Sequence, residues 1–347
     1  MEEEDRALIE SLAFQFGHSP DSYLIVDPDS GAFLSSCEQA CVAVIDDGRG
    51  MHIPGGILGR VEVHDRLLAE VTQFAEENGR RLGFYSILGE DLPLFRKHNY
   101  QITKFGEEPY LKLGQLTWTG KKYEWVRRQT NYCKRQGLEF REVNRDTCDV
   151  NQWNSIKQQL LTITENHVAG RSSPRELRLL DGRMMPDHLG KRRLFIAYHQ
   201  DTPDEVMAYL VCNPMREGRS WGIEIYRKRN DSSRGVIPFL FREIIDLLQG
   251  EGAEEVSLCV IPGRGVNRMP GDSPILRRTM QSWYGPLGIL FDSQGQCHFK
   301  SRFRPQYRDR YVCIRPKFNF GDGIAFMKTT QAWPFHWGNV FRSLLKR

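Results

Sequence analysis

The fold is decided by residues 221–261, which read WGIEIYRKRNDSSRGVIPFLFREIIDLLQGEGAEEVSLCVI. Residues 221–227 have the pattern of a β-strand, and apolar residues then recur at helical spacing from about 236 to 249. The buried stripe of that helix would consist of Ile237, Leu240, Phe241, Ile244, Ile245 and Leu248. A second strand is expected at 255–261. Strand, helix and strand in direct succession favour α/β layering over a helix bundle or a β-sandwich.

The first half of the chain has the same order of elements without the same sequence. We expect strands at 41–45, 82–88 and 100–105 and helices at about 63–78 and 92–98, with Gly79 ending the longer helix. In the second half, a further helix is expected at 273–283. Two copies of one α/β unit, side by side, are therefore the predicted architecture. A chain of 347 residues is also longer than one hydrophobic core usually supports.

A basic helix connects the two predicted units. Residues 121–137 read KKYEWVRRQTNYCKRQG, and Gly137 is expected to end the helix. The apolar face would consist of Tyr123, Val126, Thr130 and Cys133. Arg127, Asn131 and Lys134 line up on one shoulder of the helix, and Lys121, Arg128 and Arg135 on another. The pattern fits a phosphate-binding helix and equally a solvated basic linker.

Composition narrows the class of protein. Hydrophobic residues make up 40% and charged residues 27%, as in ordinary soluble proteins, and the net charge of +4 is mild. The eight cysteines are scattered without a C-x-x-C pair, which favours reduced thiols over disulfides or a zinc site. The acidic start, MEEEDR, does not resemble a signal peptide, and no run of about 18 apolar residues predicts a membrane span. We expect a cytosolic protein, with work at the surface of a membrane left open.

Several common catalytic motifs are missing. The glycine-rich loop at 46–60 lacks the G-K-[ST] ending of a P-loop and the G-x-G-x-x-G spacing of a dinucleotide site. The sequence G-R-G at 263–265 is similar to an acetyltransferase phosphate loop, but it does not open a helix directly. There is no H-E-x-x-H pattern among the nine histidines and no G-x-S-x-G elbow. No metal site and no serine-hydrolase site are therefore predicted.

The segment 298–311 reads HFKSRFRPQYRDRY and alternates basic with aromatic residues. Read as a strand with a period of two, it would gather cations on one face and anchor the other face in the core. The cationic face would carry His298, Lys300, Arg302 and Arg304, and the core face Phe299 and Phe303. A negatively charged ligand is expected at the cationic face.

Glu224 and Arg227 form a second candidate pair. Ile223 and Ile225 would face the core, so Glu224 points to the opposite side of its strand. A spacing of three does not place both charged residues on one face, so a bulge or a strand end near Tyr226 is required for both to line a cleft. An ordinary ion pair on the sheet surface fits these two residues equally well.

Three blocks of sequence together resemble one family. They are GEEPYLKL with TGKKYEWVRRQTNYCKRQGLEF (106–113 and 119–140), IEIYRKRNDSSRGVIPFLF (223–241) and FDSQGQCHFKSRFRPQYRDRY (291–311). In this order they resemble the soluble C-terminal catalytic region of the aminoacyl-phosphatidylglycerol synthases, which includes the phosphatidylglycerol lysyltransferases. We expect a stand-alone form of that region, without the family's membrane-spanning part. Each block alone would be weak, whereas the set is fairly specific.

The resemblance implies a tandem pair of acetyltransferase-like (GNAT) folds, each a mixed sheet flanked by helices. It implies an N-terminal domain at 1–118, a basic linking helix and strand at 119–145 and a catalytic domain at 146–315. The remaining tail, 316–347, contains WPFHWGNVFRSLLKR at 333–347, whose composition suits either a membrane interface or packing on the protein itself.

The resemblance also implies an activity, the transfer of an aminoacyl group from aminoacyl-tRNA to a lipid hydroxyl with no further cofactor. Its catalytic positions fall on Glu224, Arg227 and Lys300. Glu224 replaces the more usual aspartate, and Arg302 stands where a second lysine is common. Lys300 or Arg227 would stabilise the oxyanion or hold a headgroup phosphate, while Glu224 would bind the α-ammonium group or deprotonate the attacking hydroxyl.

The expected partners are aminoacyl-tRNA and an anionic phospholipid at the inner surface of the cytoplasmic membrane, with a separate membrane protein as a further candidate. Arg127, Asn131, Lys134, Arg302 and Arg304 are expected to bind phosphate of these substrates, and Tyr311 is expected to be a further substrate-binding residue. Two other functions stay open from the residues: an acyl-CoA-dependent transferase, and a non-catalytic module that binds tRNA or anionic lipid.

Overall fold

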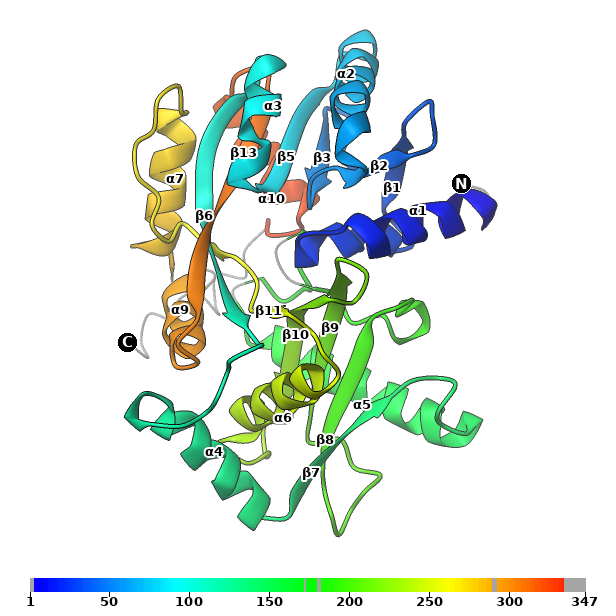
Figure 1. Cartoon of the computed structure of the whole chain (residues 1–347), viewed down its shortest axis with the longest axis vertical. Coiled ribbons are helices and arrows are strands. Elements are labelled where there is room, and N and C mark those ends of the chain that lie inside the picture. Colours follow the sequence, from blue (N-terminus) through cyan, green and yellow to red (C-terminus); the bar gives the residue numbers. More distant parts are fainter. Residues whose placement is uncertain (1–2, 172, 180–181, 289–291, 334–347) are drawn as a thin grey trace.

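The computed structural model describes residues 3–171, 173–179, 182–288 and 292–333 (Figure 1). Within them, one mixed sheet runs through the whole molecule in the order β1-β2-β3-β5-β13-β6-β11-β10-β9-β8-β7, with helices packed on its faces (Figure 1). The short strands β4 and β12 pair with β2 and β6. None of the helices in these residues is long and apolar enough to cross a membrane.

The N-terminal half contains the following elements, with 3₁₀ helices labelled η. They are α1 (Glu3–Phe16), η1 (Pro20–Val26), β1 (Gly31–Leu34), β2 (Ala40–Asp46), β3 (Gly50–Pro54), β4 (Leu58–Gly59), α2 (Val61–Glu77), β5 (Arg81–Ile87), η2 (Gly89–Asp91), α3 (Leu92–Lys97) and β6 (Gln101–Lys112).

The remainder of the chain builds the other half and then returns. Its elements are η3 (Lys121–Tyr123), α4 (Glu124–Arg135), β7 (Leu138–Val143), α5 (Val150–Ala169), η4 (Pro186–His188), β8 (Arg193–His199), β9 (Ala208–Met215), β10 (Ser220–Lys228), α6 (Val236–Gly250), β11 (Glu255–Ser257), β12 (Ile261–Pro262), α7 (Pro274–Tyr284), α9 (Ser293–Ser301), β13 (Gln306–Arg315) and α10 (Phe320–Thr329).

The predicted duplication is confirmed by the topology. In each half, antiparallel strands are followed by a helical crossover to a parallel strand: β3–α2–β5 in the first and β10–α6–β11 in the second. The crossover helices cover separate cores, with Leu67, Leu68 and Val71 buried in α2 and the predicted stripe of α6 largely buried. The tandem acetyltransferase-like α/β class is therefore confirmed.

The two halves are joined through β6 and β13. The long strand β6 pairs with β13 along one edge and with β11 and β12 along the other. β13, which lies in the predicted domain 146–315, is thus inserted between β5 and β6 of the N-terminal half. In the other direction, α1 and η1 pack against β9 of the second half. This exchange of elements brings residues from both halves to their junction.

The strand prediction for 298–311 is wrong over its first part. Residues 293–301 form α9, a turn follows, and a strand begins only at Gln306. Phe299 and Phe303 are four residues apart, a spacing that puts side chains on one face of a strand and of a helix alike. Their rings lie 5.5 Å apart, and both pack into the core, Phe303 fully buried. Their role as core anchors is confirmed, although the element that carries them is different.

Helix α9 begins at a strong local signal. Asp292, in the left-handed region with φ 45°, caps the helix by accepting a hydrogen bond from the backbone N–H of Gly295 at 3.2 Å. The helix ends before Arg304, which is also left-handed (φ 56°) and precedes a proline, a position that disfavours helix. The helical geometry turns Lys300 inward, leaving it 3% exposed.

A buried ionic cluster centred on Glu108 fastens β6, β13 and β11 together. Arg308 donates from Nε and Nη2 to the carboxylate of Glu108 at 3.0 Å each, and Arg310 and Ser257 donate to it as well. Arg310, 0% exposed, also donates to the carbonyls of Ser86 (2.9 Å) and His18 (3.0 Å). Burial by itself would raise the pKa of Glu108, but the charges of Arg310 and Arg308 outweigh it and lower this pKa to about 2.

Glu108→Gln is expected to lower the free energy of unfolding by about 3 kcal/mol, because it leaves the buried guanidinium of Arg310 without its counter-charge. Urea titration measures this loss. Since the pKa of Glu108 is lowered from 4.5 to about 2, the stabilisation is present above pH 4.5 and disappears as the pH falls toward 2. Glu254→Gln, which removes a carboxylate that is 49% exposed, is the matched control and should cost under about 1 kcal/mol. Equal losses in both variants would contradict the assignment.

Candidate active site

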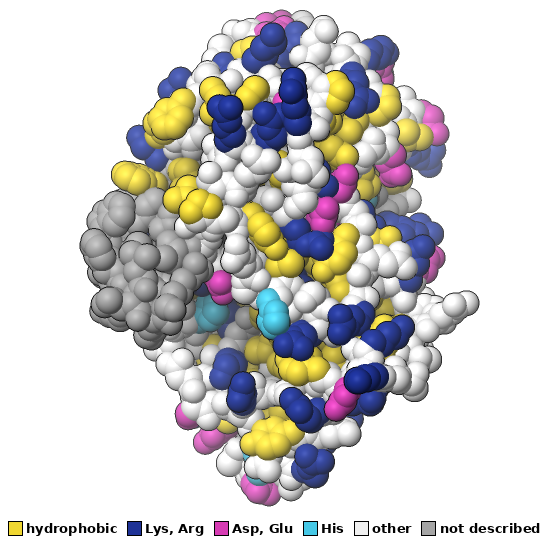
Figure 2. Space-filling model, turned by 90° about the vertical axis from the view of Figure 1, so that its left-hand side faces the viewer, with side chains coloured by type: hydrophobic (Ala, Val, Ile, Leu, Met, Phe, Trp, Pro, Cys, Tyr) yellow, Lys and Arg dark blue, Asp and Glu magenta, His cyan; other side chains and the backbone are white. Residues whose placement is uncertain are grey.

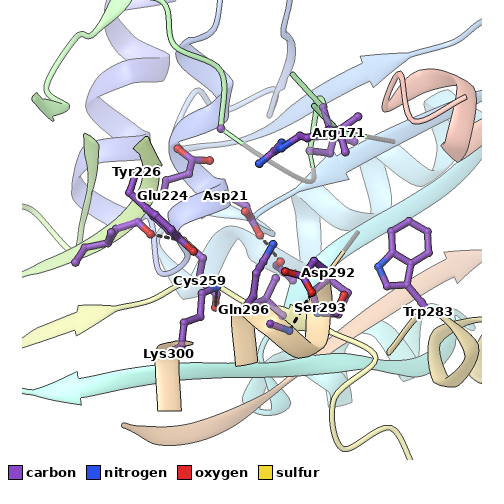
Figure 3. A pocket seen from close by; sticks show the side chains of 18 of the residues that line it. Asp21, Arg171, Glu224, Tyr226, Cys259, Trp283, Asp292, Ser293, Gln296 and Lys300 are labelled. Atoms are coloured by element: carbon purple, nitrogen blue, oxygen red, sulfur yellow. Dashed lines mark hydrogen bonds between the residues drawn. The ribbon is translucent and has the colours of Figure 1, made fainter. Parts of the chain in front are cut away.

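A cavity of about 520 Å³ opens at the junction of the two halves (Figure 3). Strand β10 contributes Glu224 and Arg227 to its wall, and α9 contributes Ser293, Gln296 and Lys300. The remaining lining comes from distant parts of the chain and includes Asp21, Tyr85, Ser86, His167, Arg171, Cys259, Trp283, Asp292 and Phe326. The three predicted catalytic residues, Glu224, Arg227 and Lys300, therefore line one cavity.

The predicted irregularity in β10 is present. The register of β10 against β9 shifts between Ile223 and Ile225, so the bulge lies at Glu224 itself, two residues before the expected position at Tyr226. Ile223 and Ile225 are both buried, while Glu224 is only half-buried and reaches the cavity. The bulge allows Glu224 and Arg227, three residues apart, to line the same space.

Glu224 is held by a buried polar relay. Its Oε2 accepts a hydrogen bond from Nδ2 of Asn213 at 2.5 Å, and the same nitrogen lies 2.9 Å from the carbonyl of Pro20. Oδ1 of Asn213 accepts from Nε of Arg192 at 3.1 Å, and Arg192 in turn pairs with Asp27 at 2.8 Å. Burial raises the pKa of Glu224 to about 8, opposed by the charge of Arg192. A carboxyl group with such a pKa can take up and release a proton near neutral pH.

Lys300 reaches the cavity from α9. Its Nζ donates to the carbonyl of Cys259 at 3.2 Å. The predicted strand 255–261 is interrupted there: β11 ends at Ser257 and β12 begins at Ile261, with Cys259 between them in the left-handed region (φ 63°). The Cys259 thiol donates to the carbonyl of Ile223 at 3.0 Å, and burial raises its pKa well above the ordinary value, so it is no thiolate nucleophile. The interruption instead provides a carbonyl that positions the ammonium group.

Arg227 is committed to holding the cavity wall. Its side chain is 1% exposed, and Nη1 donates to Oε1 of Glu176 at 2.5 Å and to the hydroxyl of Tyr209 at 3.3 Å. Nη2 donates to the carbonyl of Gly182 at 3.1 Å. Glu176 also accepts from the backbone N–H of Met184 at 2.8 Å. These contacts fasten the segment around Glu176 and Gly182 to the sheet, which gives Arg227 a positioning role.

Arg227→Lys is expected to lower the free energy of unfolding by about 2 kcal/mol, because an ammonium group cannot reproduce the forked contacts to Glu176 and Gly182. Thermal melting measures this effect, and limited proteolysis should show faster cleavage near Glu176. Arg229→Lys, which alters an exposed pair with Asp231, serves as the control and should melt like the wild type. Unchanged melting and proteolysis in Arg227→Lys would exclude the positioning role.

The other six predicted site residues lie away from the cavity; none of them is among the described residues that line it. Arg127 donates to the carbonyls of Trp118 (2.6 Å) and Gly120 (2.8 Å), and Lys134 pairs with Glu243 at 2.8 Å. Asn131 is exposed on α4, and Arg304 donates to the carbonyl of Lys122 at 3.3 Å.

Arg302 and Tyr311 are also engaged outside the cavity. The guanidinium of Arg302 lies over the ring of Trp125 at 5.6 Å, and the hydroxyl of Tyr311 donates to Asp309 at 3.2 Å. Spacing along the sequence put Arg302 on one face with Lys300, but α9 and its contact with Trp125 turn Arg302 elsewhere.

Two acidic residues of the cavity were missed from the sequence. In Figure 3, Asp21 lies between Glu224 on one side and Asp292 and Gln296 on the other. Asp21 accepts a hydrogen bond from Ser86, and burial raises its pKa despite that bond. Asp21 belongs to the N-terminal segment that packs on β9, and no local pattern in the sequence marks that contact. The capping signal at Asp292 could have been read, since an aspartate precedes the start of α9.

Comparison with known proteins supports the sequence resemblance. A family model described as phosphatidylglycerol lysyltransferase, C-terminal, matches residues 10–314. A phosphatidylglycerol lysyltransferase of Bacillus subtilis is 24% identical over 287 residues, which is 83% of this chain and 32% of the relative. The chain thus spans about a third of the length of that relative.

Two solved structures share the fold. A DUF2156 C-terminal domain from Agrobacterium fabrum superposes with a TM-score of 0.76 at 21% identity, covering 96% of this chain and 98% of that chain. L-PGS from Bacillus licheniformis superposes with a TM-score of 0.76 at 20% identity, covering 95% and 97%. Both therefore share the fold over most of this chain.

Proposed function

The chain belongs to the family of phosphatidylglycerol lysyltransferase C-terminal regions, and on this basis we propose that it transfers an aminoacyl group from aminoacyl-tRNA to a hydroxyl group of phosphatidylglycerol or a related anionic lipid. The observation that carries the proposal is that Glu224 and Lys300 line one cavity, the first a proton acceptor with a pKa of about 8 and the second a buried cation. Moving an aminoacyl group from one oxygen atom to another requires a proton acceptor for the attacking hydroxyl and a cation for the oxyanion.

The proposed reaction is one substitution at an ester carbonyl. The lipid hydroxyl attacks the carbonyl carbon, and the carboxylate of Glu224 takes the hydroxyl proton. The tetrahedral oxyanion forms beside the ammonium group of Lys300, which stabilises it in a site shielded from bulk water. The bond to the ribose oxygen then breaks, and Glu224 returns the proton to that oxygen, so that free tRNA and an aminoacyl lipid are released.

Lysine is the first amino acid to test. The family and the similar protein of Bacillus subtilis carry the name lysyltransferase, and three carboxyl groups, those of Asp21, Glu224 and Asp292, line the cavity. These carboxyl groups, which lie alongside the cations Arg171, Arg227 and Lys300, offer partners for the two ammonium groups of lysine. Glu224, as the proton acceptor, would leave Asp21 and Asp292 to meet the lysine cations.

The lipid is proposed to approach along α10. Phe326 of this helix lines the cavity, whereas Phe320 (72% exposed) and Ile324 (46% exposed) face solvent beyond it. Exposed apolar side chains on a helix are typical of a segment that lies on a membrane surface. The earlier candidate for membrane contact, 333–347, lies outside the described residues apart from Trp333, which is 49% exposed.

The proposal is tested by incubating the purified chain with tRNAs charged separately with radiolabelled amino acids and with phosphatidylglycerol vesicles. Label is expected to enter the organic phase from lysyl-tRNA and to comigrate with an aminoacyl lipid. Label that stays in the aqueous phase with every charged tRNA, for a protein that melts cooperatively, would overturn the proposed function.

A further inference from the structure

A second concavity lies beside the active-site cavity. This groove, of about 810 Å³, is formed by α4, the end of β10 and the start of α6. We call it the basic groove; besides Arg227, its lining includes four cations, Arg128, Arg135, Lys228 and Arg234, and the aromatic residues Trp125 and Tyr132. Lys and Arg side chains gather around hydrophobic ones over the lower half of the face that carries α4 (Figure 2).

The cations of the basic groove are not neutralised by the protein. Within the part of the chain that the structure describes, none of the four forms an ion pair, although Lys228 contacts the hydroxyl of Ser232 at 3.3 Å. Neighbouring cations behave differently, since Lys134 pairs with Glu243 and Arg229 pairs with Asp231 at 2.6 Å. Arg128, Arg135 and Arg234 are exposed. Four unpaired positive charges around one concavity make a strong site for an anion.

The basic groove adjoins the active-site cavity. His167, Tyr226, Arg227 and Phe299 line both of them. The rings of Tyr226 and Phe299 are stacked, with centroids 5.8 Å apart. A ligand bound along α4 could therefore extend one end past these rings toward Glu224 and Lys300.

We propose that the basic groove binds the phosphate backbone of the donor RNA near its single-stranded 3′ end, and so directs the ester-linked amino acid into the cavity. The identity of this RNA as aminoacyl-tRNA rests on the proposed function. Backbone phosphates pair with the four cations, and exposed aromatic rings such as Tyr132, 43% exposed, offer stacking surfaces for bases.

Geometry favours a nucleic acid over a lipid headgroup in this groove. Arg128 and Arg135 are seven residues apart on α4, which separates them by about 10 Å along the helix. Positive charge spread over this length matches consecutive phosphates of a strand better than the single phosphate of one headgroup. The site is also concave, so a flat bilayer surface would not follow it.

This assignment differs from the sequence-based expectation for the same helix. Arg127, Asn131 and Lys134 were expected to meet phosphate, but the shoulder of α4 that lines the basic groove carries Arg128 and Arg135. The helical period of the sequence defines two shoulders of α4 but does not show which of them borders the basic groove. The packing of α4 on α6 decides it, since it buries Val126, Thr130 and Cys133 and fixes the rotation of the helix.

The test is a filter-binding titration of the full chain with uncharged tRNA at several salt concentrations. Arg128→Gln with Arg135→Gln is expected to weaken binding at least about tenfold and to reduce the slope of log K against log salt by about 1.5. Lys121→Gln with Lys122→Gln removes the same charge from exposed positions before α4 and outside the groove, and should stay within about threefold of wild type. Melting temperatures of both double variants should match the wild type.

Each outcome is decisive for the groove separately from the proposed function. Equal losses in the two double variants, or no loss in the groove variant, would overturn the groove assignment even where label still moves from tRNA to lipid. Groove-dependent tRNA binding without any transfer would retain the groove and overturn the proposed function. Sedimentation with phosphatidylglycerol vesicles is the lipid arm: loss of vesicle binding with tRNA binding intact in the groove variant would reassign the groove to lipid and contradict the proposal.

Discussion

Glu224→Gln is expected to lower the rate of aminoacyl transfer about 10³-fold, because glutamine keeps the shape of the side chain but cannot accept the proton of the attacking hydroxyl. Asn213, which donates to Glu224 at 2.5 Å, can still contact the amide oxygen, so the cavity should keep its form. Single-turnover transfer from lysyl-tRNA to phosphatidylglycerol vesicles measures the chemical step. An effect confined to KM, with kcat unchanged, would instead make Glu224 a ligand of the α-ammonium group.

The pH dependence gives Glu224 a second, independent readout. With a pKa of about 8, its carboxylate form decreases as the pH falls, so wild-type kcat/KM should drop about tenfold per unit below pH 8. Glu224→Gln should lack this limb. The pKa is raised from 4.5 in the folded state, so wild-type stability declines as the pH rises from 4.5 to 8. The variant, permanently neutral, should melt above the wild type at pH 8.5 and equal it near pH 4.5.

Lys300→Met is expected to reduce transfer about 10³-fold, because it removes the cation beside the developing oxyanion while filling nearly the same volume. Lys300 is 3% exposed and its ammonium lies 3.2 Å from the carbonyl of Cys259, so the cavity is built around this group. The measurement is again single-turnover transfer. Lys300→Arg, which keeps the charge in a bulkier shape, should recover part of the lost rate.

A control variant at the neighbouring Cys259 tests whether the loss in Lys300→Met comes from the missing charge or from disturbed packing around it. Cys259→Ser alters the group beside Lys300 without removing the carbonyl that Lys300 contacts, and it should retain transfer within about tenfold. Melting curves identify variants that lose activity through unfolding. A folded Lys300→Met protein with wild-type transfer would remove Lys300 from the mechanism.

Local elements were largely predictable because their signals are local. The helix at 236–249 appears as α6 (Val236–Gly250), and the helix expected at 63–78 appears as α2 (Val61–Glu77). The strand expected at 298–311 is wrong over its first part because Phe299 and Phe303 satisfy the period of a strand and of a helix alike, and the cap at Asp292 decided for the helix; from Gln306 onward the strand is present as β13. The insertion of β13 between β5 and β6 depends on pairing across some 200 residues and has no local signature.

The residues of the candidate site were also predictable only in part. Family resemblance named Glu224, Arg227 and Lys300, and the structure brings all three to one cavity. The resemblance could not show that Arg227 is fastened to Glu176, or that Asn213 and Arg192 hold Glu224, because these contacts connect residues up to 51 positions apart in the sequence. Asp21 enters the cavity only because the N-terminal segment packs on β9 of the other half.

The central claim is that the cavity between Glu224 and Lys300 moves an aminoacyl group from tRNA to a lipid hydroxyl. Mass spectrometry of phosphatidylglycerol after incubation with the chain and either lysyl-tRNA or an acyl-CoA tests it most directly. We predict that the lipid gains the mass of one lysyl residue with lysyl-tRNA, that ribonuclease treatment of the donor abolishes the gain, and that Glu224→Gln and Lys300→Met do not produce it. Unmodified lipid with lysyl-tRNA, or acylated product from acyl-CoA alone, would contradict the account.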